Sequence, residues 1–130
     1  MPPYASQEGL HPCRVLVVDD HVDSAETLGH VLSAYGYNVS LAFTPEQALE
    51  VSQDFQPQVA VLDINLPHFD GHVLAGKIRQ LPGMDECVCV AVTGYLDEEY
   101  RERSERQGFR GHLVKPIEVQ ALLELLSTKH

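Results

Sequence analysis

Polar side chains stand where four predicted strands end, and their types could together hold a phosphoryl group. Each follows a short apolar run: Asp19, Asp20, Asp63, Thr93 and Lys115. In an open parallel sheet, ligands bind beyond the carboxyl ends of the strands, so we expect these side chains to converge there. Any one of them alone is typical of a helix cap, a turn or a loop. It is their joint placement that indicates a site.

The acidic members of this set need a positive charge beside them, because converging carboxylates repel one another. A hard divalent cation prefers oxygen ligands, and Mg²⁺ takes one or two carboxylates together with water and phosphate oxygens. The Lys115 ammonium and the Thr93 hydroxyl can hold further anionic oxygens. A carboxylate nucleophile, a metal, a cation and a hydroxyl are the parts of a site that forms an acyl phosphate.

Apolar runs alternate with helical patterns along the chain, and this alternation predicts the element that positions each polar residue. We expect strands at 14–18, 39–43, 59–62, 88–92 and 109–114. Their apolar character throughout is typical of strands buried on both faces of a parallel sheet. The sequence therefore predicts an α/β fold with a doubly wound, five-stranded parallel sheet and helices on both faces.

Cap signals and apolar spacing place the helices between these strands. Thr44-Pro45-Glu46-Gln47 combines a hydroxyl cap with a first-turn proline, so a helix is expected to start there. The helix that begins near Gly71 is expected to carry Val73, Leu74 and Ile78 on its inner side. The helix over 97–107 is nearly all charged, which predicts a loosely held helix with acid–base pairs four residues apart. A leucine-rich helix over 117–126 ends the pattern.

Length and charge restrict the function classes. A chain of 130 residues fits one domain, which we expect over 13–130 after a flexible leader at 1–12. The net charge of −10 argues against direct binding to nucleic acid or to an anionic membrane. Before Lys77 the only basic residue is Arg14, set against ten acids, so a divalent cation or a basic partner would fit that half.

Several signals point to the cytoplasm. The first nine residues lack the basic start and apolar centre of a signal peptide, and no apolar run is long enough to span a membrane. Three cysteines make an improbable disulfide scaffold. Cys87 and Cys89 alternate on a predicted strand and should therefore share one face as small apolar residues.

The motifs around the polar strand ends resemble those of response-regulator receiver domains in two-component signalling. The matching segments are Val-Leu-Val-Val-Asp19-Asp20, Val-Leu-Asp63-Ile-Asn65-Leu-Pro67-x-x-Asp70-Gly71, Ala-Val-Thr93-Gly94 and Leu-Val-Lys115-Pro116. The resemblance runs from about Cys13 to the C-terminus with element order and spacing intact. The fold implied is the flavodoxin-like, CheY-like arrangement of five βα units. Segments such as Gly-His112-Leu-Val-Lys-Pro look most like those of receivers attached to hybrid histidine kinases.

The resemblance implies a role for each matching residue. Asp63 would accept a phosphoryl group from a phosphohistidine. The Mg²⁺ ligands implied are Asp19 (through water), Asp20, Asp63 and the backbone carbonyl of Asn65. Thr93 and Lys115 would hold phosphoryl oxygens, and the Lys115–Pro116 bond would be cis.

The function implied is that of a phosphoacceptor switch, which is not a metabolic enzyme and catalyses only its own phosphorylation and dephosphorylation. Its donor would be a histidine kinase or a histidine phosphotransfer domain. The last two helices and the fifth strand would offer a surface for docking or for a homodimer. Receivers often carry Tyr or Phe three residues before the lysine, as a ring that changes exposure when Thr93 moves. Here that position is His112, so either a reorienting imidazole or a strand histidine without a signalling role fits.

Two other protein classes share parts of this pattern. Phosphatases of the haloacid dehalogenase type also use an aspartyl phosphate, Mg²⁺, a threonine and a lysine. They need a second acid two residues after the nucleophile, where this chain has Asn65. Flavodoxin-type modules share the sheet but need a hydroxyl-rich phosphate loop after the first strand, where Asp19 and Asp20 would oppose an anion.

Overall fold

The computed structural model describes residues 13–64, 70–94 and 98–127. The strands are β1 Arg14–Val18, β2 Asn38–Ala42, β3 Val59–Asp63, β4 Val88–Thr93 and β5 Gly111–Val114. The helices are α2 Val22–Ala34, α3 Pro45–Phe55, α4 Gly71–Gln80, α5 Glu98–Arg106 and α6 Val119–Ser127. Strands and helices alternate as the sequence predicts. The expected leader at 1–12 and the expected metal ligand Asn65 lie outside the described residues.

All five strands pair in parallel in one sheet, in the order β2-β1-β3-β4-β5. β2 lies on one side of β1, and β3, β4 and β5 follow on its other side. β1 and β3 are therefore parallel neighbours whose carboxyl ends lie side by side. Asp19 follows β1 and Asp63 ends β3. The α/β prediction, with a doubly wound five-stranded sheet, is thus confirmed.

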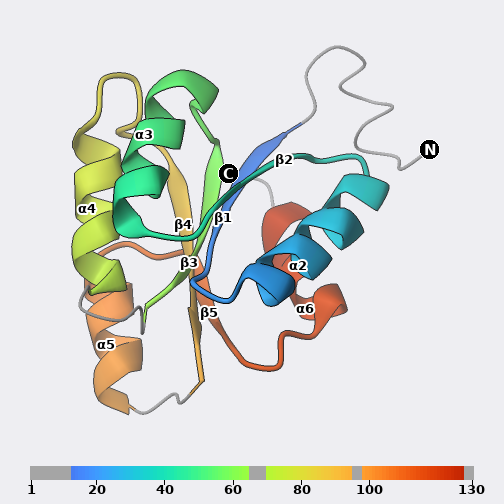
Figure 1. Cartoon of the computed structure of the whole chain (residues 1–130). Helices are drawn as coiled ribbons and strands as arrows, with labels where there is room; N and C mark the ends of the chain where they lie inside the picture. Colours follow the sequence, from blue (N-terminus) through green and yellow to red (C-terminus); the bar gives the residue numbers. More distant parts are fainter. Residues whose placement is uncertain (1–12, 65–69, 95–97, 128–130) are drawn as a thin grey trace.

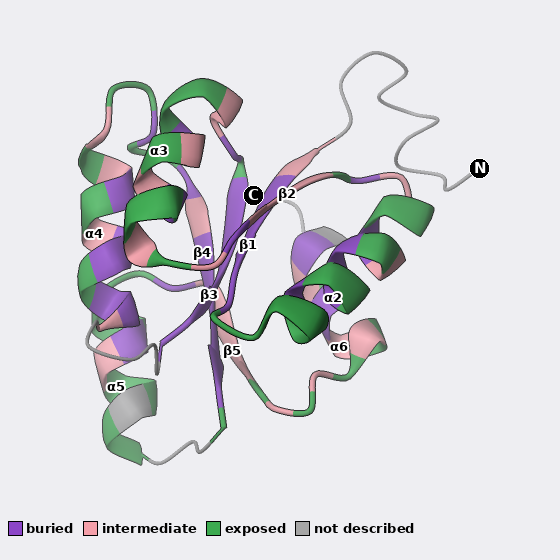
Figure 2. Ribbon diagram, in the orientation of Figure 1, coloured by how far each residue is buried: buried purple, intermediate pink, exposed green. Residues whose placement is uncertain are grey.

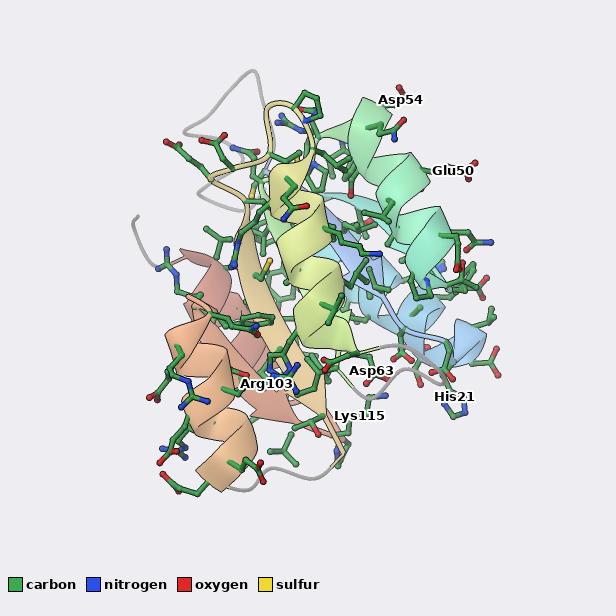
Figure 3. The ribbon with its side chains drawn as sticks, turned by 90° about the vertical axis from the view of Figure 1, so that its left-hand side faces the viewer. His21, Glu50, Asp54, Asp63, Arg103 and Lys115 are labelled. Carbon is green, nitrogen blue, oxygen red and sulfur yellow. The ribbon has the colours of Figure 1, made fainter. Side chains whose placement is uncertain are left out.

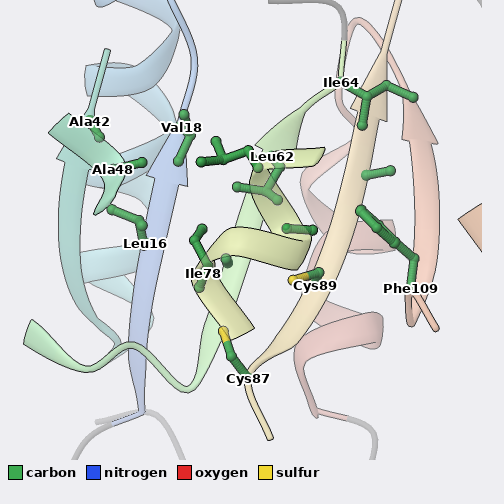
Figure 4. Packing of buried hydrophobic residues seen from close by; sticks show 14 of the residues in the cluster. Leu16, Val18, Ala42, Ala48, Leu62, Ile64, Ile78, Cys87, Cys89 and Phe109 are labelled. Carbon is green, nitrogen blue, oxygen red and sulfur yellow. The ribbon is translucent and has the colours of Figure 1, made fainter. Parts of the chain in front are cut away.

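Helices cover both faces of the sheet, with α2 and α6 on one side and α3, α4 and α5 on the other (Figure 1). Alternate residues of each strand point to opposite faces. The face under α2 and α6 buries a row of valines: Val15, Val17, Val59, Val61, Val90 and Val92. The opposite face, shown in Figure 4, buries a second cluster that includes Leu16, Val18, Leu62, Cys89 and Ile78. Cys87 belongs to the same cluster, so the shared face predicted for the two cysteines is confirmed.

Local signals explain where the helices begin. The Thr44 hydroxyl accepts a hydrogen bond from the Gln47 amide at 3.1 Å, and Pro45 occupies the first turn of α3. The Gln47 side chain in turn accepts from the Phe43 amide at 2.9 Å, which satisfies one more free N–H of the helix start. The Asp70 carboxylate caps α4 by accepting from the His72 amide at 2.8 Å.

The expected inner side of α4 was wrong at one position. Leu74 and Ile78 are buried, but Val73 is 45% exposed and His72, at 2% exposed, lies inside in its place. Figure 2 shows that α4 carries both buried and exposed residues along its length. The Asp70 cap sets the rotation of the first turn. Hydrogen bonds of the imidazole with Asp70 and Ser104 offset the free-energy cost of burying it. β5 begins at Gly111 and α6 at Val119, each two residues after the expected start.

Helix α5 has the thin apolar side that its sequence predicts. Among its described side chains only Ser104 is buried, while most of the others face solvent. Arg103 pairs with Asp70 of α4, not with Glu99 of its own helix. None of the described helices is long and apolar enough to cross a membrane.

Candidate functional site

A lysine bridges two carboxylates at the carboxyl edge of the sheet. The Lys115 ammonium donates to the Asp63 carboxylate at 2.9 Å and lies 3.4 Å from a carboxylate oxygen of Asp19. Figure 3 shows Asp63 and Lys115 pointing toward one another at this edge. The three residues come from the ends of β3, β5 and β1, so the sheet brings together groups 44 to 96 positions apart in the chain. The predicted convergence of these strand ends is confirmed.

The electrostatics of this cluster favour a charged lysine beside two acids. Burial disfavours the ammonium, but the hydrogen bond and charge of Asp63, together with the charge of Asp19, outweigh it and raise the pKa of Lys115 above 10.5. Lys115 is therefore protonated throughout the physiological range. Both acid side chains are nearly buried, so the ammonium relieves repulsion that water screens poorly there.

The end of β1 supplies oxygen donors suited to a divalent cation. Asp19, Asp20 and His21 each offer a ligand atom, and these atoms all lie within 4.8 Å of one another. The Asp19 carboxylate accepts from the His21 amide at 2.9 Å, which holds it in a fixed orientation. Two carboxylates here and a third at Asp63 form an oxygen-rich set that fits Mg²⁺, whereas the imidazole of His21 is a softer donor than Mg²⁺ selects.

Thr93 and His112 lie on one face of the sheet. Ala91 pairs with His112 and Thr93 with Val114, so the two side chains project to the side that carries α5 (Figure 1). Thr93 is fully buried at the end of β4, and its carbonyl accepts from the Lys115 amide at 2.8 Å. The Nδ1 atom of His112 is buried and has no hydrogen-bond partner among the residues that the structure describes. The Lys115–Pro116 peptide bond is cis.

A groove of about 700 Å³ opens beside the carboxylates, between α2 and the segment that joins β5 to α6. Asp19 and Lys115 line one end of it. Apolar side chains such as Leu28, Val31, Ile117 and Val119 line part of the rest, together with polar residues of α2. The groove therefore joins the acid–lysine cluster to a surface of mixed polarity.

The sequence reasoning missed a polar network between α4 and α5. The His72 imidazole contacts Asp70 through Nδ1 at 3.2 Å and Ser104 through Nε2 at 2.9 Å, and Arg103 donates to the second oxygen of Asp70. The only signals in the sequence are an Asp-x-His step at a helix start and one serine in a charged helix. Neither signal specifies a contact across 32 residues.

Comparison with known proteins identifies a matching family and several relatives. The family model of the response regulator receiver domain matches residues 15–127. An uncharacterized 14.6 kDa protein from the sodA1 3′ region of Leptolyngbya boryana is 34% identical over 112 residues, which cover 86% of each chain. The sensor histidine kinase RcsC of Salmonella typhi is 34% identical over 113 residues, 87% of this chain but 12% of that kinase.

The solved structures agree at the level of the fold. The chemotaxis protein CheY4 of Vibrio cholerae superposes with a TM-score of 0.82 at 27% identity, over 88% of this chain and 96% of that one. Receiver domains work in two-component signalling, with histidine kinases or phosphotransfer proteins as partners. The family model spans nearly all described residues, including every strand end that carries the acids and the lysine. The chain therefore belongs to the response regulator receiver domain family.

Proposed function

We propose that Asp63 accepts a phosphoryl group from a phosphohistidine donor in a Mg²⁺-dependent reaction, and that the resulting acyl phosphate switches the conformation of the domain. The observation that carries this proposal is the single ammonium of Lys115 shared between the nearly buried carboxylates of Asp63 and Asp19. A partly buried cation placed against an acid is already positioned to hold the oxygens of a group attached to that acid.

The transfer uses the chain's own residues in separate roles. A carboxylate oxygen of Asp63 attacks phosphorus, the bond between phosphorus and the donor imidazole nitrogen breaks, and that nitrogen keeps the electron pair. Lys115 then pairs with a phosphoryl oxygen, and the Thr93 hydroxyl donates to another. Hydrolysis returns the carboxylate when water attacks phosphorus and inorganic phosphate leaves.

The metal would be held by Asp20, Asp63 and the Asn65 carbonyl, with Asp19 acting through water. When bound, Mg²⁺ would offset the negative charge that the phosphoryl oxygens bring to this acidic edge. Lys115 orients the Asp63 carboxylate by donating a hydrogen bond to it, and Asp19 contacts the same ammonium.

The partner surface follows from the groove. A histidine kinase or phosphotransfer domain would lay an apolar helix face between α2 and α6, which brings its phosphohistidine to Asp63. The last two helices and β5 remain a surface for docking or self-association.

We further propose that the domain acts in the cytoplasm as a switch and turns over no metabolite. The buried thiols Cys87 and Cys89 suit a reducing compartment.

The test is the intact mass of the chain after incubation with Mg²⁺ and acetyl phosphate. Wild type should gain one phosphoryl adduct, and the adduct should be absent without metal and absent in Asp63→Asn, which removes the nucleophilic oxygen. Asp54→Asn is the matched control, because Asp54 is exposed on α3, away from the edge that carries Asp63 (Figure 3). Equal adducts in wild type and Asp63→Asn would contradict the proposal.

A further inference from the structure

Helix α5 is attached to the molecule mainly through polar contacts with α4. Its described side chains are charged or polar, and an isolated helix of nine residues is marginal in water. What holds it must come from outside the helix. Four side chains, which we name the polar clasp, join its middle to the start of α4: Asp70, His72, Arg103 and Ser104.

The chemistry of the polar clasp assigns each proton. An ionised carboxylate only accepts, so Nδ1 of neutral His72 carries a proton toward Asp70, and the Ser104 hydroxyl donates to Nε2. Burial, together with the positive charge of Arg103, lowers the pKa of His72 in spite of Asp70, which keeps the imidazole neutral at pH 7. The cap bond from the His72 amide and the contact with Arg103 outweigh burial and lower the pKa of Asp70.

This Asp–His–Ser order matches that of a hydrolase triad, but the geometry points elsewhere. Ser104 is 1% exposed and His72 is 2% exposed, so a substrate cannot reach the hydroxyl. A second tie runs from the end of α4, where Arg79 donates to the carbonyls of Gln107 at 2.8 Å and Gly108 at 3.3 Å. Contacts in the second half of α5 and just beyond its C-terminal end indicate a structural connection between two helices.

The other end of this connection reaches the phosphoacceptor strand. A Cβ atom placed on Gly71 would lie 2.4 Å from the Ile64 Cα and 3.0 Å from the Asp63 carbonyl oxygen. The start of α4 therefore packs tightly against the backbone that directly follows Asp63 at the end of β3. Close-packed backbone transmits small displacements, because it has no free space to absorb them.

We propose that the polar clasp couples the end of β3, at Asp63, to the position of α5. The regulatory role rests on the proposed function, since a phosphoryl group on Asp63 is the event that would displace the end of β3. A shift there moves the start of α4 through Gly71, and with it Asp70 and His72. The hydrogen bonds to Arg103 and Ser104 lengthen, and α5 is released from α4.

Hydrogen exchange of α5 amides tests the clasp without any phosphoryl donor. Arg103→Gln and Ser104→Ala should each speed exchange in α5 about five-fold, while exchange in α2 stays unchanged. Alanine favours helix more than serine does, so helix propensity alone would give the opposite result for Ser104→Ala. Arg106→Gln is the matched control, because it makes the same change on an exposed residue of the same helix. Exchange equal to wild type in both clasp variants would overturn the proposal.

The coupling is then tested with Mg²⁺ and acetyl phosphate, with the adduct followed by intact mass. In wild type and in Arg106→Gln, the adduct should speed exchange in α5 about five-fold, and in the two clasp variants it should add little. An adduct that leaves α5 unchanged in wild type, or that changes it equally in the clasp variants, would overturn the coupling. A wild type without an adduct would count against the proposed function instead, and the donor-free comparison would still decide whether the clasp holds α5.

Discussion

Thr93 is the residue through which a phosphoryl group would change the conformation without being needed for its attachment. It is buried at the end of β4, on the face that also carries His112. In the proposed transfer Asp63 would supply the nucleophile and Lys115, which contacts it, the nearby charge, so neither role would depend on the Thr93 hydroxyl. These separate roles predict that attachment and response can be separated by mutation.

We expect Thr93→Ala to form the phosphoryl adduct but to lower the equilibrium constant for the switched state by about 10- to 150-fold. The reason is the loss of one hydrogen bond to a charged oxygen, worth about 1.5–3 kcal/mol. Intact mass measures the adduct, and hydrogen exchange around His112 measures the response. Thr27→Ala, an exposed threonine on α2, is the control and should behave as wild type. A full response in Thr93→Ala would show that the hydroxyl has no part in the switch.

His112 differs from the aromatic ring common at this position because its ring carries a polar atom, Nδ1, that is buried and has no partner in the described part of the chain. A buried polar atom without a hydrogen bond costs free energy, so a conformation that gives Nδ1 a partner would be favoured. The imidazole shares its face with Thr93, so a movement of Thr93 would alter the space around it. The buried Nδ1 atom and the shared face with Thr93 thus give a physical reason for the predicted switching role of His112.

At the scale of the elements, the contact between β3 and α4 depends on a residue without a side chain. Gly71 touches the Ile64 backbone so closely that a methyl group there must displace one of the two elements. Gly76 lies in the same helix, and a Cβ added to it would meet nothing within 4 Å. The helix thus holds a sensitive and an insensitive glycine five residues apart.

We expect Gly71→Ala to lower the free energy of unfolding by about 1–3 kcal/mol, because it overpacks the start of α4. Gly76→Ala should raise it by about 0.5–1 kcal/mol, since alanine loses less entropy in a helix than glycine does. Urea unfolding of both variants and the wild type measures the difference. A stable Gly71→Ala variant would mean that α4 can move away from β3 at little cost.

The sequence predicts the strands well and the contacts between helices poorly, for physical reasons. Apolar runs such as 59–62 have one stable place in a parallel sheet, and their ends determine where Asp63 and Lys115 meet. The rotation of α4 depends instead on the Asp70 cap and on polar partners in α5. Residue types around Val73 favour an apolar inner face, but they carry no information about Ser104, 31 positions away.

For the whole molecule, charge and topology act together at one edge. The sheet order places the ends of β1, β3, β4 and β5 side by side, and the acids at that edge share a single described lysine contact. Helices α4 and α5, on the face of the sheet opposite α2 and α6, are joined by the polar clasp. A change of charge at the edge can therefore reach α5 through adjoining elements, without rearrangement of the valine layer under α2 and α6.

The polar clasp also makes the stability of the molecule depend on pH. Burial and the charge of Arg103 keep the pKa of folded His72 below its usual 6.5, although Asp70 opposes them. The unfolded chain therefore binds one more proton than the folded chain between pH 6.5 and that lowered value. Stability is fully present above pH 6.5 and falls as the pH drops through this window, by at most about 1.4 kcal/mol per pH unit from this one group.

His72→Gln should flatten the dependence of unfolding free energy on pH between about pH 7 and 5, because glutamine does not titrate there. It should also lower stability at pH 7, where the hydrogen bond to Ser104 is fully formed in wild type. His30→Gln, which changes an exposed imidazole on α2, is the matched control and should leave the slope as in wild type. Urea unfolding at a series of pH values gives both slopes. If His72→Gln keeps the wild-type slope, the buried imidazole is not the group that links protons to folding.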